Sequence, residues 1–290
     1  MGYIRYILSY MIKAIDHVIV AVSDLRIAEK DYIQLFGSKP VWKGSHPNLG
    51  TSNVLFNFEN TYLELLAADG QGIGADFVNN KIENEGEGLI GLVLGADNID
   101  LFRDKLSEFD YQLGEKLYGE GRNETNLIRK WSYQFLPPEL TRNLFLFIIE
   151  HEGEELPLNF SNETNLVKRL EQVVIKTNDA DGFISIYKDT YGIRLALDSV
   201  IKEWDRRMLF FRLNHTTLEV IEEKDKNMSA SDKLWGLSWG VDDIVATRKR
   251  LIENGIEISE IKEGIKENTL VATIKSHTHN IPTLLIQHTR

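Results

Sequence analysis

Two side chains that can bind a metal or move a proton lie within apolar, strand-like segments. His17 lies in "IDHVIVAV", and Glu64 lies in "TYLELLA", where the neighbouring leucines indicate a buried strand. Imidazole nitrogens and carboxylates bind borderline divalent metal ions, and both groups also serve as general acids and bases. A hydrogen-bonded polar pair with a structural role is the alternative. The residue types alone leave both interpretations open.

Strand alternation predicts which side chains accompany this pair. Successive strand residues point to opposite faces, so His17, Tyr62 and Glu64 are expected to share the face opposite their apolar neighbours. Glu150, in the run "LFLFIIEH", is expected to converge with His17 and Glu64 on one cavity. Gly91 is expected to leave room for a ligand beside them.

The segment "HPNLGTSN" supplies two further candidates, His46 and Asn53. A histidine can act as an acid or base near neutral pH, so His46 joins Glu64 as a candidate catalytic residue and also as a substrate ligand. Asn53 can hydrogen-bond a ligand. Proline and glycine also mark ordinary turns, and a plain turn remains the alternative for this segment.

The first element pattern is a strand, a helix and three strands. In "IDHVIVAVSDLRIAEKDYIQLFG" the alternating residues predict a strand, and Ser23 or Asp24 can cap the helix that follows. Ala28 and Tyr32 begin an apolar helical face, and Gly37 is a typical helix end. The runs "KPVWKG", "NVLFNF" and "TYLELLA" then predict three more strands.

This β-α-β-β-β unit recurs along the chain. Gln172, Tyr187, Gly192 and Glu219 follow His17, Tyr32, Gly37 and Glu64 at one constant, ungapped offset, and "GLVLGADNI" resembles "GLSWGVDDI" in the same way. The sequence thus predicts an α+β protein of four βαβββ modules in A-B-A′-B′ order, at 14–69, 88–151, 166–224 and 233–290. Residues 1–13 are expected to be a tail and 152–165 a linker.

Each pair of modules is expected to form a cup-shaped, mixed-sheet domain, at 14–151 and 166–290, with one helix per module on the outer face. The second half keeps Glu219 but has Gln172 in place of His17, Gln287 in place of Glu150 and Ile201 in place of His46. A neutral amide is a poor ligand for a transition metal. The second cup is therefore expected to be degenerate and to support the fold or an interface.

Composition narrows the functional classes. The net charge of −11 argues against a nucleic-acid partner, and the absence of cysteine excludes disulfides, thiolate metal sites and cysteine nucleophiles. The apolar stretch in residues 1–10 is broken and too short for a membrane span. We expect a cytoplasmic protein with a small-molecule ligand, no membrane partner, no nucleotide or flavin cofactor, and plausibly a homodimer.

The repeated βαβββ unit, "DH" on the first strand and "YLEL" on the fourth resemble the vicinal-oxygen-chelate superfamily, which includes glyoxalase I, extradiol dioxygenases and bleomycin-resistance proteins. More narrowly, "IDHVIVAVSDL", "HPNLGTSNVLFNF", "GRNETNLIRKW" and "LFLFIIEH" look like the glyoxalase-like domain family. The resemblance covers about residues 14–151 well and the second half more faintly.

The resemblance places His17 and Glu64 at metal-ligand positions, with Gly91 where a second first-strand ligand is often found. Glu150 is the candidate third metal ligand in place of Gly91, and absence of the ion is the alternative. It implies a divalent ion (Zn, Mn, Fe, Ni or Mg) that holds two adjacent substrate oxygens. Arg122 and Trp131 match family positions that can hold an anionic or planar ligand, with a surface arginine and a core tryptophan as alternatives.

The implied function is that of a small-molecule enzyme, either a lyase or isomerase or a dioxygenase-like protein, acting in the N-terminal cup. A protein of the same fold that only sequesters its ligand, as resistance proteins do, is the main alternative. A purely structural protein is the third.

Overall fold

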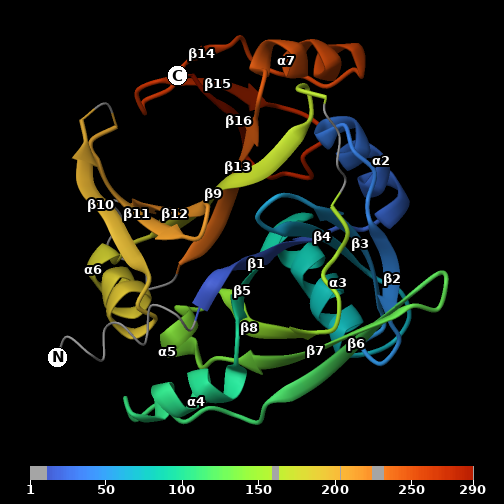
Figure 1. Cartoon of the computed structure of the whole chain (residues 1–290), viewed down its shortest axis with the longest axis vertical. Coiled ribbons are helices and arrows are strands. Elements are labelled where there is room, and N and C mark those ends of the chain that lie inside the picture. Colours follow the sequence, from blue (N-terminus) through green and yellow to red (C-terminus); the bar gives the residue numbers. More distant parts are fainter. Residues whose placement is uncertain (1–11, 159–162, 203, 224–231, 290) are drawn as a thin grey trace.

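The structure is a computed structural model that describes residues 12–158, 163–202, 204–223 and 232–289. It contains two sheets of eight strands, one from each half of the chain, with helices packed against them (Figure 1). Residues 1–11 of the expected tail lie outside the described residues, whereas Ile12 and Lys13 already belong to the first strand.

The first half contains two βαβββ modules. The first comprises β1 (Ile12–Ala21), α2 (Leu25–Phe36), β2 (Trp42–His46), β3 (Thr51–Asn57) and β4 (Tyr62–Ala68). After α3 (Ile73–Glu85), the second comprises β5 (Gly88–Ala96), α4 (Ile99–Ser107), β6 (Leu117–Asn123), β7 (Ile128–Phe135), α5 (Pro138–Thr141) and β8 (Phe145–Glu152). The strands pair in the order β1-β4-β3-β2-β6-β7-β8-β5 and close into a barrel. Pairing of β2 with β6 closes it, so the expected cup is a barrel in this half.

The second half repeats the two modules. They comprise β9 (Val167–Thr177), α6 (Ala180–Ile184), the π-helix η1 (Ser185–Thr190), β10 (Arg194–Ile201), β11 (Arg206–Leu213) and β12 (Thr216–Glu222), then β13 (Lys233–Val241), α7 (Ile244–Glu253), β14 (Lys262–Glu263), β15 (Thr269–Ile274) and β16 (Thr283–His288). The strand order is β10-β11-β12-β9-β13-β16-β15-β14, and this sheet stays open. The four-module architecture is confirmed.

Local sequence signals fix the ends of α2. The Asp24 carboxylate accepts hydrogen bonds from the backbone N–H groups of Arg26 and Ile27, at 2.9 and 3.2 Å. Gly37 ends the helix with a φ of 78°, a left-handed conformation in which glycine has no Cβ penalty. Because both caps lie where the apolar period starts and stops, α2 presents one buried face to the β1–β4–β3 region of the sheet.

One hydrophobic core runs through both halves. Trp239 of β13 is almost fully buried, and its ring packs against Phe36 of α2 and Phe58, with ring centroids 4.9 and 4.7 Å apart. The outer, helix-covered side of the barrel therefore packs against the outer side of the open sheet. The inner face of the open sheet lines a cavity.

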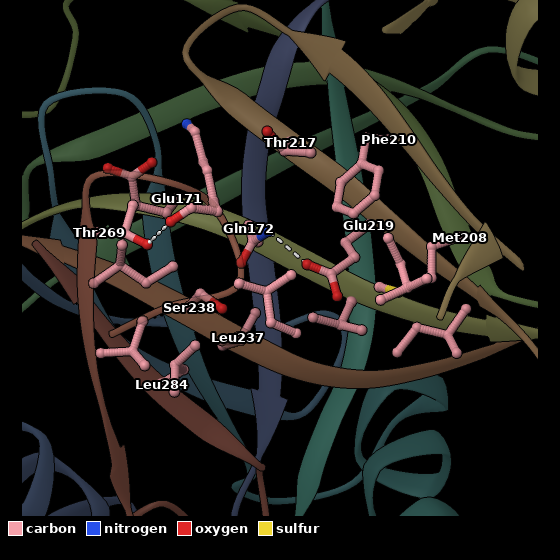
Figure 2. Close-up of a pocket in the computed structure, with 18 of the residues that line it drawn as sticks. Glu171, Gln172, Met208, Phe210, Thr217, Glu219, Leu237, Ser238, Thr269 and Leu284 are labelled. Atoms are coloured by element: carbon pink, nitrogen blue, oxygen red, sulfur yellow. Dashed lines mark hydrogen bonds between the residues drawn. The ribbon is translucent and has the colours of Figure 1, made fainter. Parts of the chain in front are cut away.

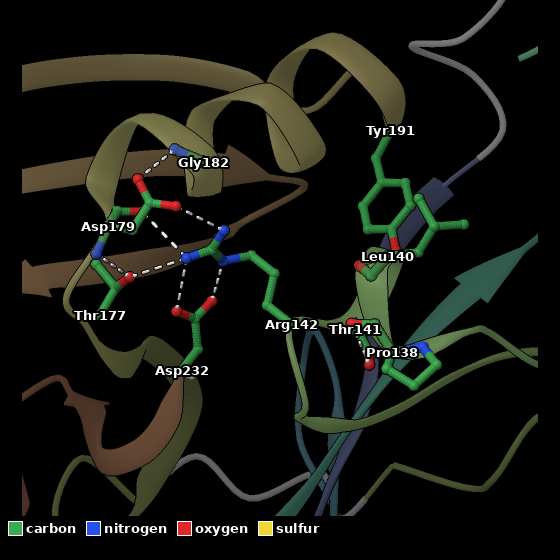
Figure 3. A network of polar contacts seen from close by, with 9 residues as sticks. All are labelled: Pro138, Leu140, Thr141, Arg142, Thr177, Asp179, Gly182, Tyr191 and Asp232. Atoms are coloured by element: carbon green, nitrogen blue, oxygen red, sulfur yellow. Dashed lines mark hydrogen bonds and ion pairs between the residues drawn. The ribbon is translucent and has the colours of Figure 1, made fainter. Parts of the chain in front are cut away.

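A buried ion pair also joins the halves (Figure 3). Arg142, which follows α5, donates two hydrogen bonds to Asp232 at 2.7 and 3.2 Å, and its Nη1 lies 3.2 Å from Asp179. Tyr191 adds a hydrogen bond from its hydroxyl to the carbonyl oxygen of Leu140, at 2.6 Å. Arg142 and Asp232 are both buried, so each needs the other as its partner. The ion pair therefore favours this one arrangement of the two halves.

Candidate active site

His17 and Glu64 meet inside the N-terminal barrel. β1 pairs in parallel with β4 so that His17 lies opposite Tyr62, and Glu64 is the next inward-facing residue on β4. The Nε2 atom of His17 lies 3.4 Å from a carboxylate oxygen of Glu64. Both residues are nearly inaccessible, with exposed fractions of 3% and 7%. Strand alternation therefore predicts this pair correctly.

A second carboxylate holds the other side of the His17 ring. The Nδ1 atom of His17 lies 2.6 Å from Asp16, whose carboxylate is also 3.1 Å from Nε2 of His151. An irregularity in the pairing of β1 with β5 at this point lets consecutive residues reach one another. Burial opposes charge on His17, but its hydrogen bonds with Asp16 and Glu64 outweigh burial and raise its pKa. The two carboxylates thus favour the protonated form of His17.

Asn53 connects this ion pair to His46. Its side-chain N–H group donates to Glu64 at 2.7 Å and lies 3.4 Å from Nε2 of His46. Because an amide N–H only donates, Nε2 of His46 is an acceptor, and its Nδ1–H faces the Thr51 hydroxyl at 3.0 Å. Burial lowers the pKa of His46, with a smaller opposing effect from Glu64. His46 is therefore a neutral imidazole with an available lone pair at pH 7.

The same amide leaves one acceptor unused. The side-chain oxygen of Asn53 is buried and has no hydrogen-bond partner among the described residues. A buried acceptor without a partner costs free energy, and such groups are normally satisfied by water or a ligand. The position of Asn53 between Glu64 and His46 thus marks a place where a donor group of a ligand fits.

Aromatic side chains form the walls. Trp131 lies edge-on to His46, with ring centroids 5.6 Å apart, and Tyr62 stacks on His17 at 4.4 Å. Gly119 and Gly121 of β6 face the Trp131 ring, and a β-carbon at Gly119 would collide with it. The structure therefore brings His46, Trp131 and Tyr62 to one site, as the sequence predicts.

Arg122 is not part of this site. Gly121 faces inward toward His46 and Trp131, so its neighbour Arg122 points to the outside of the barrel and is exposed. The inward-facing arginine is Arg129, which pairs with Gly121 across β6 and β7. Arg129 and Trp131 are two residues apart on β7 and therefore point to the same, inward face, which is the signal in the sequence that could have identified Arg129.

Arg129 supplies the positive charge that was expected of Arg122. Its guanidinium lies 5.9 Å from the ring centroid of Tyr62 and 5.7 Å from that of Trp42. One of its nitrogens is 3.5 Å from Nδ1 of His151. Among the described residues no carboxylate forms an ion pair with Arg129, so its charge is available to a ligand.

The structure does not bring Glu150 to the pair. Its carboxylate accepts a hydrogen bond from the backbone N–H of Ile99 at 2.9 Å, which caps α4 on the outer face. The expected convergence is wrong because Leu146 and Ile148 share this face with Glu150 and pack in the core beneath the helices. The inward-facing residue of β8 is the next one, His151, which pairs with Trp131.

The expected free space at Gly91 is also absent. A β-carbon there would lie 2.9 Å from Ile19 and 3.1 Å from Phe145, so these side chains fill the position. The unpredicted helix α3 covers the inner face nearby, where Val78 packs in one buried cluster with Ile19 and Val93. His46 and Trp131 are less deeply buried than His17 and Glu64.

Comparison with known families now places the chain. Residues 15–191 match the glyoxalase-like domain family, and residues 171–273 match the glyoxalase/bleomycin resistance protein/dioxygenase superfamily. The chain belongs to the glyoxalase-like domain family. The first match includes every residue of the His17–Glu64–Asn53–His46 chain. A search of curated protein sequences finds no match.

Solved structures with the same fold include enzymes. A mutant of 4-hydroxymandelate synthase from Streptomyces coelicolor has a TM-score of 0.67 at 14% identity, covering 97% of this chain and 94% of that one. A Mn(II)-bound glyoxalase from Novosphingobium aromaticivorans has a TM-score of 0.65 at 13% identity, covering 97% and 83%. A hypothetical protein from Staphylococcus aureus has a TM-score of 0.62 at 13% identity, covering 96% and 100%. At these identities the likeness establishes the fold.

The barrel offers fewer metal ligands than a catalytic metal site normally has. His17 and Glu64 offer one nitrogen and one carboxylate, and Asp16 is placed as an outer partner of His17. Within the described ranges, however, no three His, Asp or Glu side chains are arranged to hold a metal. Catalytic metal sites typically use three protein ligands. The chemistry of the site is therefore derived without a metal.

The described residues contain no helix long and apolar enough to span a membrane.

Proposed function

We propose that this glyoxalase-like protein is an enzyme that transfers a proton on a small molecule bound in the N-terminal barrel. The observation that carries the proposal is the hydrogen-bonded chain from His17 through Glu64 and Asn53 to His46. This chain holds a neutral imidazole next to an ionised carboxylate in a water-poor site. Such an arrangement suits general base catalysis near neutral pH.

His46 is the base in this proposal. Its contact with Asn53 is long at 3.4 Å, so a substrate C–H or O–H group can replace it at Nε2. When His46 takes the proton, the negative charge of Glu64 stabilises the new imidazolium, because Glu64 acts to raise the pKa of His46. His46 then returns the proton to another position or the opposite face of the substrate, which makes the reaction an isomerisation.

The substrate class follows from the charges around the base. Arg129, which no described carboxylate neutralises, provides positive potential at this site, and this favours an oxygen that carries or develops negative charge. Asn53 offers a buried acceptor to a hydroxyl group. We propose a substrate with two adjacent oxygens, such as a 2-oxo or 2-hydroxy acid, whose C–H proton passes to His46 while its electron pair moves to the carbonyl oxygen.

The test is exchange of substrate C–H protons with solvent. The protein is incubated in D₂O with a panel of 2-oxo and 2-hydroxy acids, and loss of the C–H signal is followed by proton NMR. His46→Gln is expected to slow exchange at least about 100-fold, since general base catalysis contributes roughly that much. His215→Gln is the matched control, because His215 is exposed on the β11–β12 turn.

A sequestering protein is the second candidate, and one observation favours it. α3 packs against the inner face of the barrel, and His17 and Glu64 are almost inaccessible, so turnover requires more access than this structure shows. If acids of this class bind tightly while no C–H proton exchanges under any condition, sequestration replaces catalysis as the function.

A further inference from the structure

The open sheet of the second half encloses a cavity of about 1300 Å³. This is larger than the 300–1,000 Å³ of typical small-molecule sites, so it can hold an extended ligand. In Figure 2, Met208 and Phe210 lie on one side of the cavity and Leu237 and Leu284 on the other. The inner face of the second half is therefore a lined cavity, whereas the sequence led us to expect a degenerate cup that supports the fold or an interface.

A polar pair lies in the middle of these apolar walls. Gln172 donates a hydrogen bond to Glu219 at 2.5 Å, from the positions that correspond to His17 and Glu64 in the repeat (Figure 2). Burial raises the pKa of Glu219 to about 7. Unlike Glu64, it has no cationic partner among the described residues, so it is partly neutral at physiological pH and repels an anion weakly.

Two arginines stand opposite each other at one edge of the cavity. Arg194 of β10 and Arg212 of β11 are directly paired in the strand register, and both side chains are exposed. Like charges at directly opposite positions destabilise a sheet. Arg212 donates to the Thr217 hydroxyl at 2.6 Å, but within the described ranges neither arginine forms an ion pair with a carboxylate.

The charge of the whole lining has the opposite sign to that of the chain. The chain carries a net charge of −11, yet the cationic side chains around the cavity outnumber the acidic ones. The cations are Lys176, Arg194, Arg206, Arg212, Lys262 and Lys266, and the acids are Glu171, Glu219, Glu223 and Glu263. Lys176 and Glu223 pair with each other at 3.2 Å. The remaining excess attracts an anion.

We infer that the C-terminal cup binds an amphipathic organic acid, with its anionic group at Arg194 and Arg212 and its apolar body against Phe210 and neighbouring walls. The Gln172–Glu219 pair supplies a donor and an acceptor for a polar group in the middle of that body. This site is separate from the N-terminal barrel and does not depend on the reaction proposed there. The occupant is a small molecule, because Arg194 and Arg212, which no described carboxylate neutralises, place positive charge at one edge of a half-open, mostly apolar cavity.

Two fluorescent probes that differ in charge test this inference. 1-Anilinonaphthalene-8-sulfonate is an anionic aromatic molecule, and N-phenyl-1-naphthylamine is its uncharged relative. Both are titrated into the full chain, and probe fluorescence is followed in wild type and in a Trp204→Phe/Trp235→Phe variant, which removes the two tryptophans that line the cavity. We expect saturable binding of one anionic probe per chain, and tighter binding of the anion than of the neutral probe.

Variants separate the roles of charge and shape. The double variant Arg194→Gln/Arg212→Gln is expected to weaken binding of the anionic probe about tenfold or more, and of the neutral probe less than about twofold. Arg207→Gln is the matched control, since Arg207 lies on β11 but faces outward and pairs with Asp198. Ala196→Trp, at an exposed lining position, is expected to block both probes.

Three results would overturn the inference. They are equal affinity for the two probes, equal weakening of anion binding by Arg207→Gln, or full binding to the Ala196→Trp variant. Light scattering provides a further check. If the chain dimerises and dimerisation alone displaces the anionic probe, a second copy of this chain is the occupant and the small-molecule assignment fails. Circular dichroism confirms that each variant is folded.

Discussion

At the scale of single residues, the two halves show how a neighbour sets protonation. Glu64 is buried, but hydrogen bonds and charge from His17 and nearby groups outweigh burial and lower its pKa. Glu219 stands at the matching position with the neutral Gln172 beside it, so burial acts alone and raises its pKa to about 7. Replacement of the polar partners of Glu64, including histidine by glutamine at position 172, thus reverses the direction of the shift.

The first prediction concerns the two histidines of the barrel. In an NMR titration His17 should lose its proton at a pH above its ordinary pKa of 6.5, and His46 below it. Glu64→Gln should lower the pKa of His17, because a neutral amide no longer stabilises the imidazolium. A neutral His17 at pH 6 in the wild-type protein would contradict the charge assignment.

The second prediction concerns the pH dependence of stability. The folded-state pKa of Glu219 is about 7 against an ordinary 4.5, so between these values the folded state binds the proton more tightly than the unfolded state. The free energy of unfolding should therefore fall as pH rises from about 4.5 to about 7, by at most about 3 kcal/mol. Denaturant unfolding of wild type and Glu219→Gln measures this. A fall of the same size in Glu219→Gln would assign it to other groups.

At the scale of elements, the repeat explains a residue that strand alternation alone misplaces. Glu150 caps α4 through the backbone N–H of Ile99, and Gln287 caps α7 through that of Ile244, at 2.9 and 2.8 Å. An acid and an amide perform one structural task at matched positions. This repetition supports a capping role for Glu150 and gives no support for a role in metal binding.

The third prediction follows from this cap. Glu150→Ala should reduce the free energy of unfolding by about 0.5–2 kcal/mol, as the loss of a helix cap does. It should leave substrate C–H exchange in the barrel within about twofold of wild type, since the side chain lies on the outer face. Unfolding and exchange are measured on the same preparation. If Glu150→Ala lost substrate C–H exchange while the free energy of unfolding stayed unchanged, Glu150 would have a role in the active site and the capping role would be contradicted.

The sequence predicts those features that depend on local pattern. Alternation and capping residues yield the four modules, the ends of α2 and the inward positions of His17 and Glu64. They do not determine which residues of β6 and β8 point into the barrel. In β6 the two glycines leave no apolar alternation to follow, and in β8 Glu150 shares its face with core residues. Barrel closure through β2 and β6, and the packing of α3 on the inner face, depend on long-range contacts.

At the scale of the whole molecule, the two halves form one structural unit. Trp239 of the second half packs on Phe36 of the first, and the Arg142–Asp232 pair crosses the same interface. The inner faces of the two sheets differ in the side chains that line them. The closed barrel holds a compact charged chain of groups, and the open sheet holds a larger, mostly apolar volume with cations at its edge.

The fourth prediction tests this unity. Arg142→Leu should lower the free energy of unfolding by about 3–5 kcal/mol, because it leaves Asp232 buried without its partner. Arg207→Gln, which breaks a more exposed arginine–aspartate contact, should cost about 1 kcal/mol or less. Both are measured by denaturant unfolding. Separate transitions for the two halves in the wild-type protein would contradict a shared core.

The most direct test of the central claim compares matched residues of the two halves in one assay. Solvent deuterium exchange of a responsive 2-oxo or 2-hydroxy acid is measured with wild type, His46→Gln and Glu219→Gln. Proton transfer in the N-terminal barrel predicts that His46→Gln loses exchange about 100-fold or more while Glu219→Gln retains it. Full exchange in His46→Gln together with its loss in Glu219→Gln would place the chemistry in the C-terminal cup and contradict the account.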